Sequence, residues 1–294
     1  MKKLLIVGGS GLIGSACIKK GLKKNYKISS LSLKKNIRIK NVNCYHFDYS
    51  SFKNFKKIES NFDFIINAGG YFLKKNRDFK KLDKHFLGLK NIINFSDKKK
   101  LKKIIHIGSS LEYEGLNSPL REEMLCDPKS YYGKIKLKCT KYCQLMFKKR
   151  KIPITVIRPF SIFSKNQTKG LIYHLIQSIS RTNKLKTKSI PESIDLIHLD
   201  DLIDAIFSLL NSNNTNGKIL NIGSGSPTKV IKIIKFIYKA RKLSFNDNII
   251  YNLRLKKGEF YPDIKKISKF IGWKKKKNLF INLNRIAKNF NIKS

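Results

Sequence analysis

Acidic residues are scarce in this sequence. Its 294 residues include 19 Asp and Glu but 63 Lys and Arg, so the formal net charge is +44. Such an excess suggests an anionic partner: a nucleic acid, a membrane surface or a phosphorylated ligand. However, most of the cations are Lys spread along the whole chain, whereas nucleic-acid recognition favours clustered Arg. We therefore attribute most of the charge to composition and do not expect a nucleic-acid partner. Runs such as Lys274–Lys277 are predicted to lie on solvated surfaces.

Cysteine is also scarce, and no two Cys residues have CxxC spacing. The five cysteines are odd in number, which argues against a complete disulfide framework and favours reduced thiols in the cytoplasm. Cys139 and Cys143 are one helical turn apart, which favours a buried helix face over a metal site. The His residues have no metal-ligand spacing with one another or with carboxylates. We therefore predict no metal site.

The sequence has no apolar run long enough to span a bilayer. Its first residues, MKKLLIVGGSGLIGSA, share two lysines and an apolar run with signal peptides, but four glycines interrupt that run. We therefore predict no membrane association and assign this segment to the fold.

Short apolar runs alternate with amphipathic stretches along the chain. Apolar residues with helical spacing predict a helix over Leu202–Leu210. Alternation of strands and helices predicts an α/β fold in which helices cover both faces of a parallel, doubly wound Rossmann sheet. The predicted strands are Leu4–Val7, Lys27–Leu31, Cys44–Phe47, Phe64–Asn67, Ile104–Ile107 and Ile154–Ile157.

Three glycines follow the first predicted strand at GxxGxxG spacing. Gly8 would allow a tight turn, Gly11 a close backbone approach to a pyrophosphate, and Gly14 close packing of a helix on the strand. Leu12 and Ile13 lie between these glycines, and the free N–H groups at the N-terminus of the next helix would bind phosphate. These five residues are predicted to contact a dinucleotide cofactor.

The end of the second predicted strand indicates the cofactor type. A carboxylate there would hold the ribose 2′-hydroxyl of NAD. This sequence instead has Ser32, Lys34 and Arg38 in that region and no acid, which favours the 2′-phosphate of NADP over NAD. Asp48, after the third strand, would face the adenine amino group; the alternative is that it only caps a turn.

A Tyr and a Lys four residues apart follow the fifth predicted strand. On a helix, Tyr132 and Lys136 would share one face, so the ammonium could stabilise a phenolate and make the Tyr an acid or base. Ser109 lies at the carboxyl end of that strand, where open α/β sheets bind ligands. Its hydroxyl would hydrogen-bond the reacting oxygen.

With these motifs the chain resembles the NAD(P)-dependent epimerase/dehydratase family, the extended short-chain dehydrogenases/reductases that act on nucleotide sugars. The resemblance implies catalytic roles for Ser109, Tyr132 and Lys136, and cofactor contacts for Ala68, Gly69 and Phe160. The matching segments are GGSGLIG, FIINAGG, GSSLEYEG, SYYGKIK, VIRPFSIF, DLIHLDDLIDAI, LNIGSG and DIKKISKFIGWK.

The resemblance also implies a domain organisation and a reaction. Residues 1–160 would mainly form the Rossmann domain and 161–294 mainly a smaller substrate lobe, with 195–225 returning to the Rossmann sheet. Hydride transfer would occur at C4 of a nucleotide-linked sugar, and a homodimer is implied. The acid pair that dehydratases carry directly after the catalytic hydroxyl is replaced by Ser110 and Leu111, with Glu112 one place too late. This favours a 4-epimerase or 4-keto reductase over a 4,6-dehydratase.

Alternatives stay open at the level of the sequence. The charge allows a catalytically silent RNA-binding member of the fold, and the same fold serves reductases of non-nucleotide substrates. The Arg that often contacts the diphosphate before a DFIHVDD segment is missing, and Ile194 stands near its place. Arg158, Arg181 and Arg254 are candidate replacements, although each is more readily explained as a surface residue.

Overall fold

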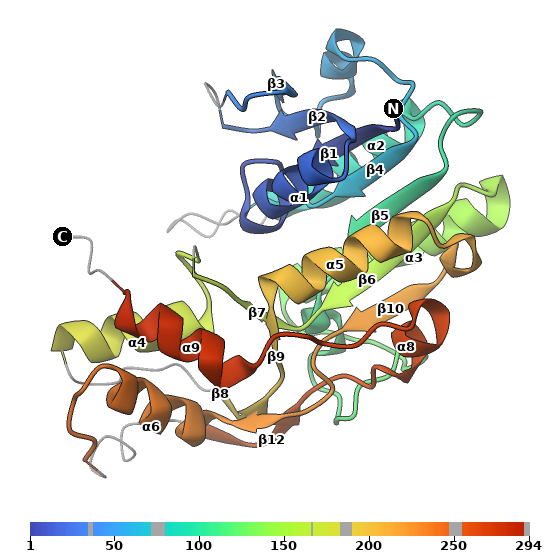
Figure 1. Ribbon diagram of the computed structural model, residues 1–294. Helices are drawn as coiled ribbons and strands as arrows, with labels where there is room; N and C mark the ends of the chain where they lie inside the picture. Colours follow the sequence, from blue (N-terminus) through green and yellow to red (C-terminus); the bar gives the residue numbers. More distant parts are fainter. Residues whose placement is uncertain (35–37, 72–79, 166, 183–189, 247–254, 291–294) are drawn as a thin grey trace.

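A computed structural model describes residues 1–34, 38–71, 80–165, 167–182, 190–246 and 255–290. A large sheet with its helices forms one lobe, and shorter strands with further helices form a second lobe below it in the view of Figure 1. Within the described residues, no helix is long and apolar enough to cross a membrane.

The large sheet has seven parallel strands in the order β10-β6-β5-β4-β1-β2-β3. From β3 to β6 this is the doubly wound Rossmann order, which confirms the predicted fold class. All six predicted strands are present, with their ends shifted by two residues at most. The strands are β1 (Lys3–Val7), β2 (Lys27–Ser32), β3 (Val42–His46), β4 (Phe64–Asn67), β5 (Lys103–Ile107), β6 (Ile154–Pro159) and β10 (Ile219–Ile222).

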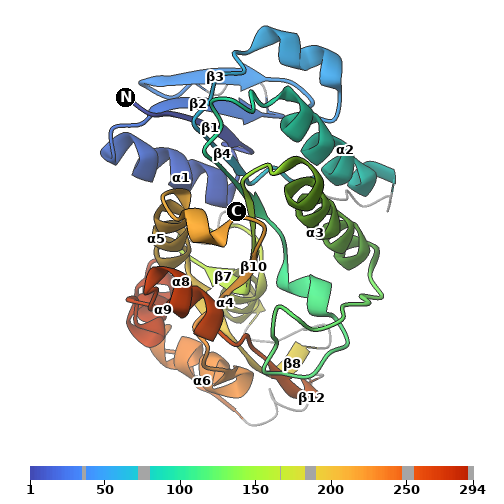
Figure 2. The ribbon, with the colours of Figure 1, turned by 90° about the vertical axis from the view of Figure 1, so that its right-hand side faces the viewer.

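Helices cover both faces of this sheet, and β1 shows why. Its side chains alternate, so that Leu4 and Ile6 join one apolar core while Leu5 and Val7 join another. The first core is closed by α1 (Leu12–Lys23) and α5 (Leu199–Leu210), and the second by α2 (Lys80–Phe95) and α3 (Tyr131–Arg150). Figure 2 shows these pairs on opposite sides of the strands. Cys139 and Cys143 of α3 are buried in the second core, as their spacing predicted.

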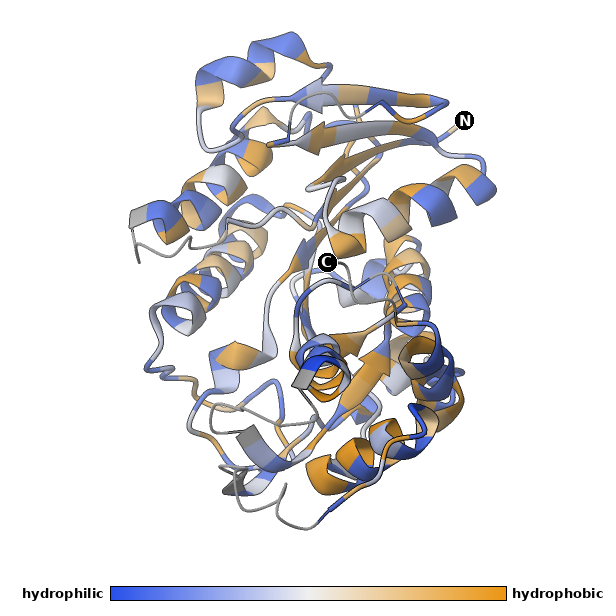
Figure 3. Cartoon of the chain, turned by 90° about the vertical axis from the view of Figure 1, so that its left-hand side faces the viewer, coloured by the Kyte–Doolittle hydropathy of each residue, from blue (hydrophilic) through white to orange (hydrophobic). Residues whose placement is uncertain are grey.

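The smaller lobe has its own core of Ile, Leu and aromatic side chains. In Figure 3 hydrophobic and hydrophilic residues alternate along its helices, as expected for helices with one buried face. Its strands are β7 (Ser161–Phe163), β8 (Ile190–Ile194), β9 (Leu196–His198), β11 (Thr228–Lys229) and β12 (Leu255–Phe260). Its helices include α4 (Leu171–Thr182), α6 (Val230–Ala240) and α9 (Leu279–Lys288), while α8 (Lys265–Ile271) packs near β10.

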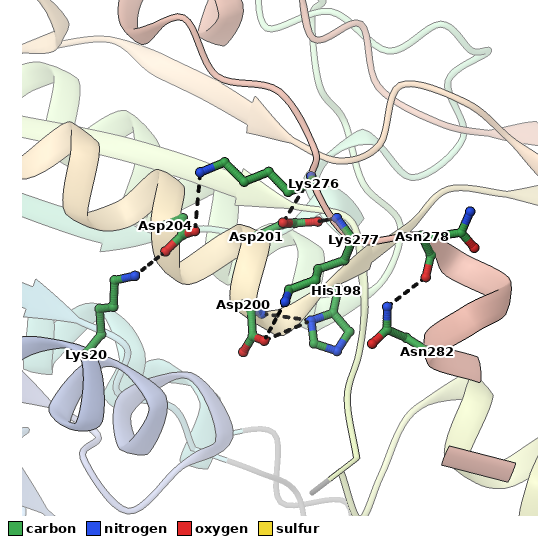
Figure 4. A network of polar contacts seen from close by, with 9 residues as sticks. All are labelled: Lys20, His198, Asp200, Asp201, Asp204, Lys276, Lys277, Asn278 and Asn282. Carbon is green, nitrogen blue, oxygen red and sulfur yellow. Dashed lines mark hydrogen bonds and ion pairs between the residues drawn. The ribbon is translucent and has the colours of Figure 1, made fainter. Parts of the chain in front are cut away.

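The segment between α8 and α9 crosses the start of α5 (Figure 4). The buried carboxylate of Asp201 accepts the backbone N–H groups of Lys276 and Lys277 at 3.2 and 3.0 Å. The indole N–H of Trp273 donates to the Asp201 carbonyl at 3.4 Å. Asp204 pairs with Lys20 of α1 at 2.6 Å. The lysine run therefore has solvated side chains, as predicted, but its backbone is fixed to the large lobe.

Candidate functional site

The glycine loop connects β1 to α1 at the carboxyl edge of the large sheet. Gly8 has a φ of +82° and donates its N–H to the Leu31 carbonyl at 2.7 Å. A Cβ on Gly8 would lie 2.6 Å from the Ala68 oxygen, and one on Gly14 would overlap the Gly8 oxygen. Glycine is therefore required at both positions because neighbouring backbone fills the space of a side chain.

The start of α1 is free to receive an anion. Its N-cap is Gly11, no side chain caps it, and its first turn contains no acid. The helix begins at Leu12, so Leu12 and Ile13 form the start of its first turn. The positive end of the helix dipole and exposed N–H groups suit a diphosphate. The uncapped start of α1 and the tightly packed Gly8 and Gly14 therefore fit the pyrophosphate of the predicted dinucleotide.

Ser32, at the end of β2, is only 2% exposed, and its Oγ accepts the N–H of Ser10 at 3.1 Å. It thus contacts the glycine loop directly. Lys34 is exposed, while its carbonyl accepts a hydrogen bond from His46 Nδ1 at 2.7 Å, and Arg38 is also exposed. The described residues just after β2 therefore include an exposed cation, Lys34, and no carboxylate.

Asp48 belongs to a network of polar groups beyond β3. Its Oδ1 accepts from the Tyr71 hydroxyl at 2.6 Å and from the Ser50 N–H at 2.9 Å, and its Oδ2 pairs with Lys84 at 2.8 Å. Burial opposes ionisation, but these hydrogen bonds hold the pKa of Asp48 below its usual range. The turn-capping alternative therefore describes the structure, and the adenine contact stays a prediction.

Tyr132 and Lys136 lie on the first two turns of α3, as predicted. Lys136 is 4% exposed, and its Nζ donates to the Ile107 carbonyl at 2.8 Å. The same Nζ lies 5.9 Å from the centroid of the Tyr132 ring, which is partly exposed. One buried cation therefore joins the helix to the end of β5.

Ser109 starts the short helix η2 (Ser110–Tyr113) just after β5. Its Oγ accepts the Leu111 N–H at 3.1 Å. A Cβ on Gly133, next to Tyr132, would lie 2.7 Å from the Leu111 oxygen, so α3 packs directly on the serine turn. The structure thus places Tyr132 and Lys136 on a helix that contacts residues on both sides of Ser109, namely Ile107 and Leu111.

Two buried histidines lie near Lys136. The His85 ring meets Tyr132 edge-on, with centroids 5.9 Å apart, and its Nε2 accepts the Tyr71 N–H at 3.1 Å. Burial, assisted by the charge of Lys136, lowers the pKa of His85 to about 3. Burial also puts the pKa of His106 well below its usual value. Both rings are therefore neutral, which leaves the charge beside Tyr132 to Lys136.

Two other predicted cofactor contacts follow β4. The Ala68 N–H donates to the Val7 carbonyl at 3.0 Å, and the Gly69 N–H to Asn67 Oδ1 at 3.3 Å. Both residues are partly exposed beside the glycine loop.

Phe160 is 2% exposed and packs against Phe260 at a centroid distance of 5.3 Å. Its proposed contact with the nicotinamide stays a prediction.

The expectation that Arg158 is a surface residue was wrong. It is 2% exposed because it lies in β6 and pairs with the fully buried Glu112 at 2.8 Å. Arg181 is exposed, and Arg254 lies outside the described residues. Sequence reasoning missed the buried pair. The only signal was an Arg inside an apolar strand, which requires a buried acidic partner.

Comparisons with known proteins agree with this fold. The model of the NAD dependent epimerase/dehydratase family matches residues 4–223. A putative UDP-glucose 4-epimerase of Methanocaldococcus jannaschii is 26% identical, with 97% of each chain covered. The crystal structure of UDP-glucuronic acid 4-epimerase from Bacillus cereus with NAD has a TM-score of 0.83 and 20% identity, covering 97% of this chain and 96% of that one.

A further solved structure carries the other form of the cofactor. The Pseudomonas aeruginosa protein RMD, complexed with NADPH, has a TM-score of 0.79 and 18% identity, with 98% of each chain covered. The family match spans most of this chain, from β1 to the end of β10. This protein therefore belongs to the NAD dependent epimerase/dehydratase family.

Proposed function

We propose that this protein transfers a hydride at C4 of a nucleotide-linked sugar, as a 4-epimerase or a 4-keto reductase. The observation that supports the proposal is that Lys136, whose Nζ lies 5.9 Å from the Tyr132 ring centroid, donates to the carbonyl of Ile107, two residues before Ser109. This end of β5 lies at the same carboxyl edge of the parallel sheet as the glycine loop after β1. Relatives that are named UDP-glucose and UDP-glucuronic acid 4-epimerases support a UDP-sugar as the first substrate to test.

Each of the three side chains has a distinct task. One lone pair of the Ser109 hydroxyl receives the Leu111 N–H, so its proton stays available for the sugar O4. The phenol of Tyr132 takes the proton from O4 when C4 is oxidised and returns it on reduction. The ammonium of Lys136 uses one N–H on Ile107 and keeps two for the phenolate region and a ribose hydroxyl.

The nicotinamide, when bound, supplies the hydride acceptor and donor. The residues that would hold the dinucleotide are Gly8, Gly11 and Gly14, at its pyrophosphate, and the neighbouring Ala68 and Gly69. NADP is favoured over NAD because Lys34 is exposed two residues after the end of β2 and no described carboxylate follows that strand before β3. A cation suits the additional phosphate of NADP, whereas NAD calls for an acceptor of its ribose hydroxyl.

Glu112 supports C4 chemistry over 4,6-dehydration. Dehydration needs an acid or base that reaches the sugar beyond C4. Glu112 is fully buried, and both of its carboxylate oxygens are engaged, by Arg158 and by the backbone of Ser109. The neighbouring Leu111 is 44% exposed and cannot transfer a proton.

Replacement of Tyr132 by Phe tests the proposal. The variant should retain NADPH binding, seen as a rise in melting temperature, while conversion of UDP-glucose to UDP-galactose falls about 100- to 10,000-fold. Tyr131→Phe is the matched control, because the exposed Tyr131 hydroxyl bonds Asp83 at 2.7 Å, away from Lys136. Near-normal turnover by Tyr132→Phe would refute the assignment. A larger shift with NADH than with NADPH would refute the cofactor preference.

A further inference from the structure

A buried ion pair lies directly behind the catalytic serine. Glu112 has no exposed surface, and its Oε1 accepts the backbone N–H of Ser109 at 2.9 Å. Its Oε2 receives Arg158 Nε at 2.9 Å and Nη2 at 2.8 Å. One carboxylate thus connects the serine turn to a guanidinium.

The guanidinium is anchored in the sheet rather than in a loop. Arg158 lies in β6, and its Cζ is 4.4 Å from the centroid of the Tyr113 ring. The Tyr113 hydroxyl donates to Asn221 Oδ1 in β10 at 2.8 Å. Two strands of the large sheet therefore fix the position of the carboxylate that contacts Ser109.

Local sequence makes room for this contact. A Cβ on Gly108 would lie 2.6 Å from Glu112 Oε1, so a side chain there would displace the carboxylate. Glycine between β5 and Ser109 lets the carboxylate reach the serine N–H. The backbone N–H of Glu112 donates back to the Ser109 carbonyl at 3.1 Å, so the serine peptide is held from both sides.

We propose that Glu112, fixed by Arg158, is a positioning residue that holds Ser109 with its hydroxyl toward Tyr132. This inference rests on the proposed function. Glu112 does not carry a proton in the reaction, because both of its oxygens are engaged and none of its surface is exposed. A buried charged pair is a poor means of stabilisation, since an apolar pair of similar volume commonly serves as well. Its contribution is to fix one backbone geometry, on which the direction of the Ser109 hydroxyl depends.

A double-mutant cycle between Glu112 and Ser109 tests this role. The variants are Glu112→Gln, Ser109→Ala and the double variant, with Glu122→Gln as the matched control. Glu122 is also a buried carboxylate on a backbone N–H, that of Asn221 at 2.8 Å, but it does not touch Ser109. The measurements are kcat and KM for UDP-glucose, the melting temperature, and hydrogen exchange of the peptide that contains residues 108–110.

We expect Glu112→Gln to lower kcat about tenfold or more with little change in KM, because alignment rather than binding is lost. In the Ser109→Ala background it should have almost no further effect on kcat, since residues that act as a unit are not additive. Hydrogen exchange at residues 108–110 should become faster. Glu122→Gln should lower the melting temperature while kcat stays within about twofold to threefold.

Two results would overturn the positioning role. One is that the losses of kcat from Glu112→Gln and Ser109→Ala multiply in the double variant. The other is that Glu122→Gln loses as much kcat as Glu112→Gln. If Glu112→Gln does not fold, Arg158→Lys replaces it, because Lys keeps the charge but not the two-pronged contact. Failure of the proposed function gives a different result. In that case Ser109→Ala and Tyr132→Phe would have the same kcat for UDP-glucose as the native protein. Hydrogen exchange at residues 108–110 would still be faster in Glu112→Gln.

Discussion

Replacement of Gly133 by Ala should separate the stability of this protein from its activity. The new methyl would lie 2.7 Å from the Leu111 oxygen and 2.6 Å from Pro128 Cβ. Restoring ordinary contact with the oxygen requires a shift of about 0.7 Å between α3 and the serine turn, and a misplacement of about 1 Å can cost about 100-fold in rate. We therefore expect turnover to fall about 10- to 100-fold.

Stability should change much less in the same variant. Ala is better than Gly inside a helix by about 1 kcal/mol, while overpacking costs about 1–3 kcal/mol. The two effects oppose each other, so the free energy of unfolding should fall by about 0–2 kcal/mol. Urea unfolding and kcat for UDP-glucose are the two measurements, with Lys134→Ala, an exposed site on the same turn, as control. Native turnover in Gly133→Ala would refute the inference that the packing of α3 on the serine turn positions Tyr132 relative to Ser109.

Three further predictions concern other parts of the chain. Gly14→Ala should abolish the rise in melting temperature with NADPH, because its Cβ overlaps the Gly8 oxygen; an unchanged rise would contradict the cofactor site. His85, whose pKa burial lowers to about 3, binds fewer protons folded than unfolded, so stability should be lost as pH falls below about 6.5. Urea unfolding at several pH values should show a weaker dependence in His85→Gln; an equal one would contradict this. Burial also lowers the pKa of Lys103 to about 8, so the destabilisation caused by burying its ammonium should disappear as pH rises from about 8 to 10.4. Thermal unfolding of the native protein should therefore show rising stability over this pH range, and that of Lys103→Met should not. An equal rise in Lys103→Met would contradict the prediction.

Local sequence patterns predicted those parts of the structure that depend on neighbours in the chain. The apolar run of β1, the glycine spacing after it, and the four-residue interval from Tyr132 to Lys136 each describe a single strand, turn or helix face. Their physical requirements are local, so the sequence expresses them directly.

Contacts between distant residues were not predictable in this way. Glu112 and Arg158 are 46 positions apart, and the burial of the Arg depends on a partner that no local pattern identifies. Asp48 likewise acquires Lys84 and Tyr71 as partners only when three segments meet. The short strands β7, β9 and β11 have two or three residues each, too few to show a period.

The hydrogen bonds from Asp201 to the backbone between α8 and α9 affect which fragments of this protein could fold alone. Trp273 and Ile267, close to the end of the sequence, belong to the same apolar core as β1. A fragment that ended near residue 160 would lose α5 and β10 as well as this closing segment. Its sheet would keep α1 but lose α5 from one face, and it would lack the edge strand β10. The large lobe is therefore completed by residues 267–277, which follow most of the smaller lobe in the sequence. Folding of the two lobes should consequently be coupled.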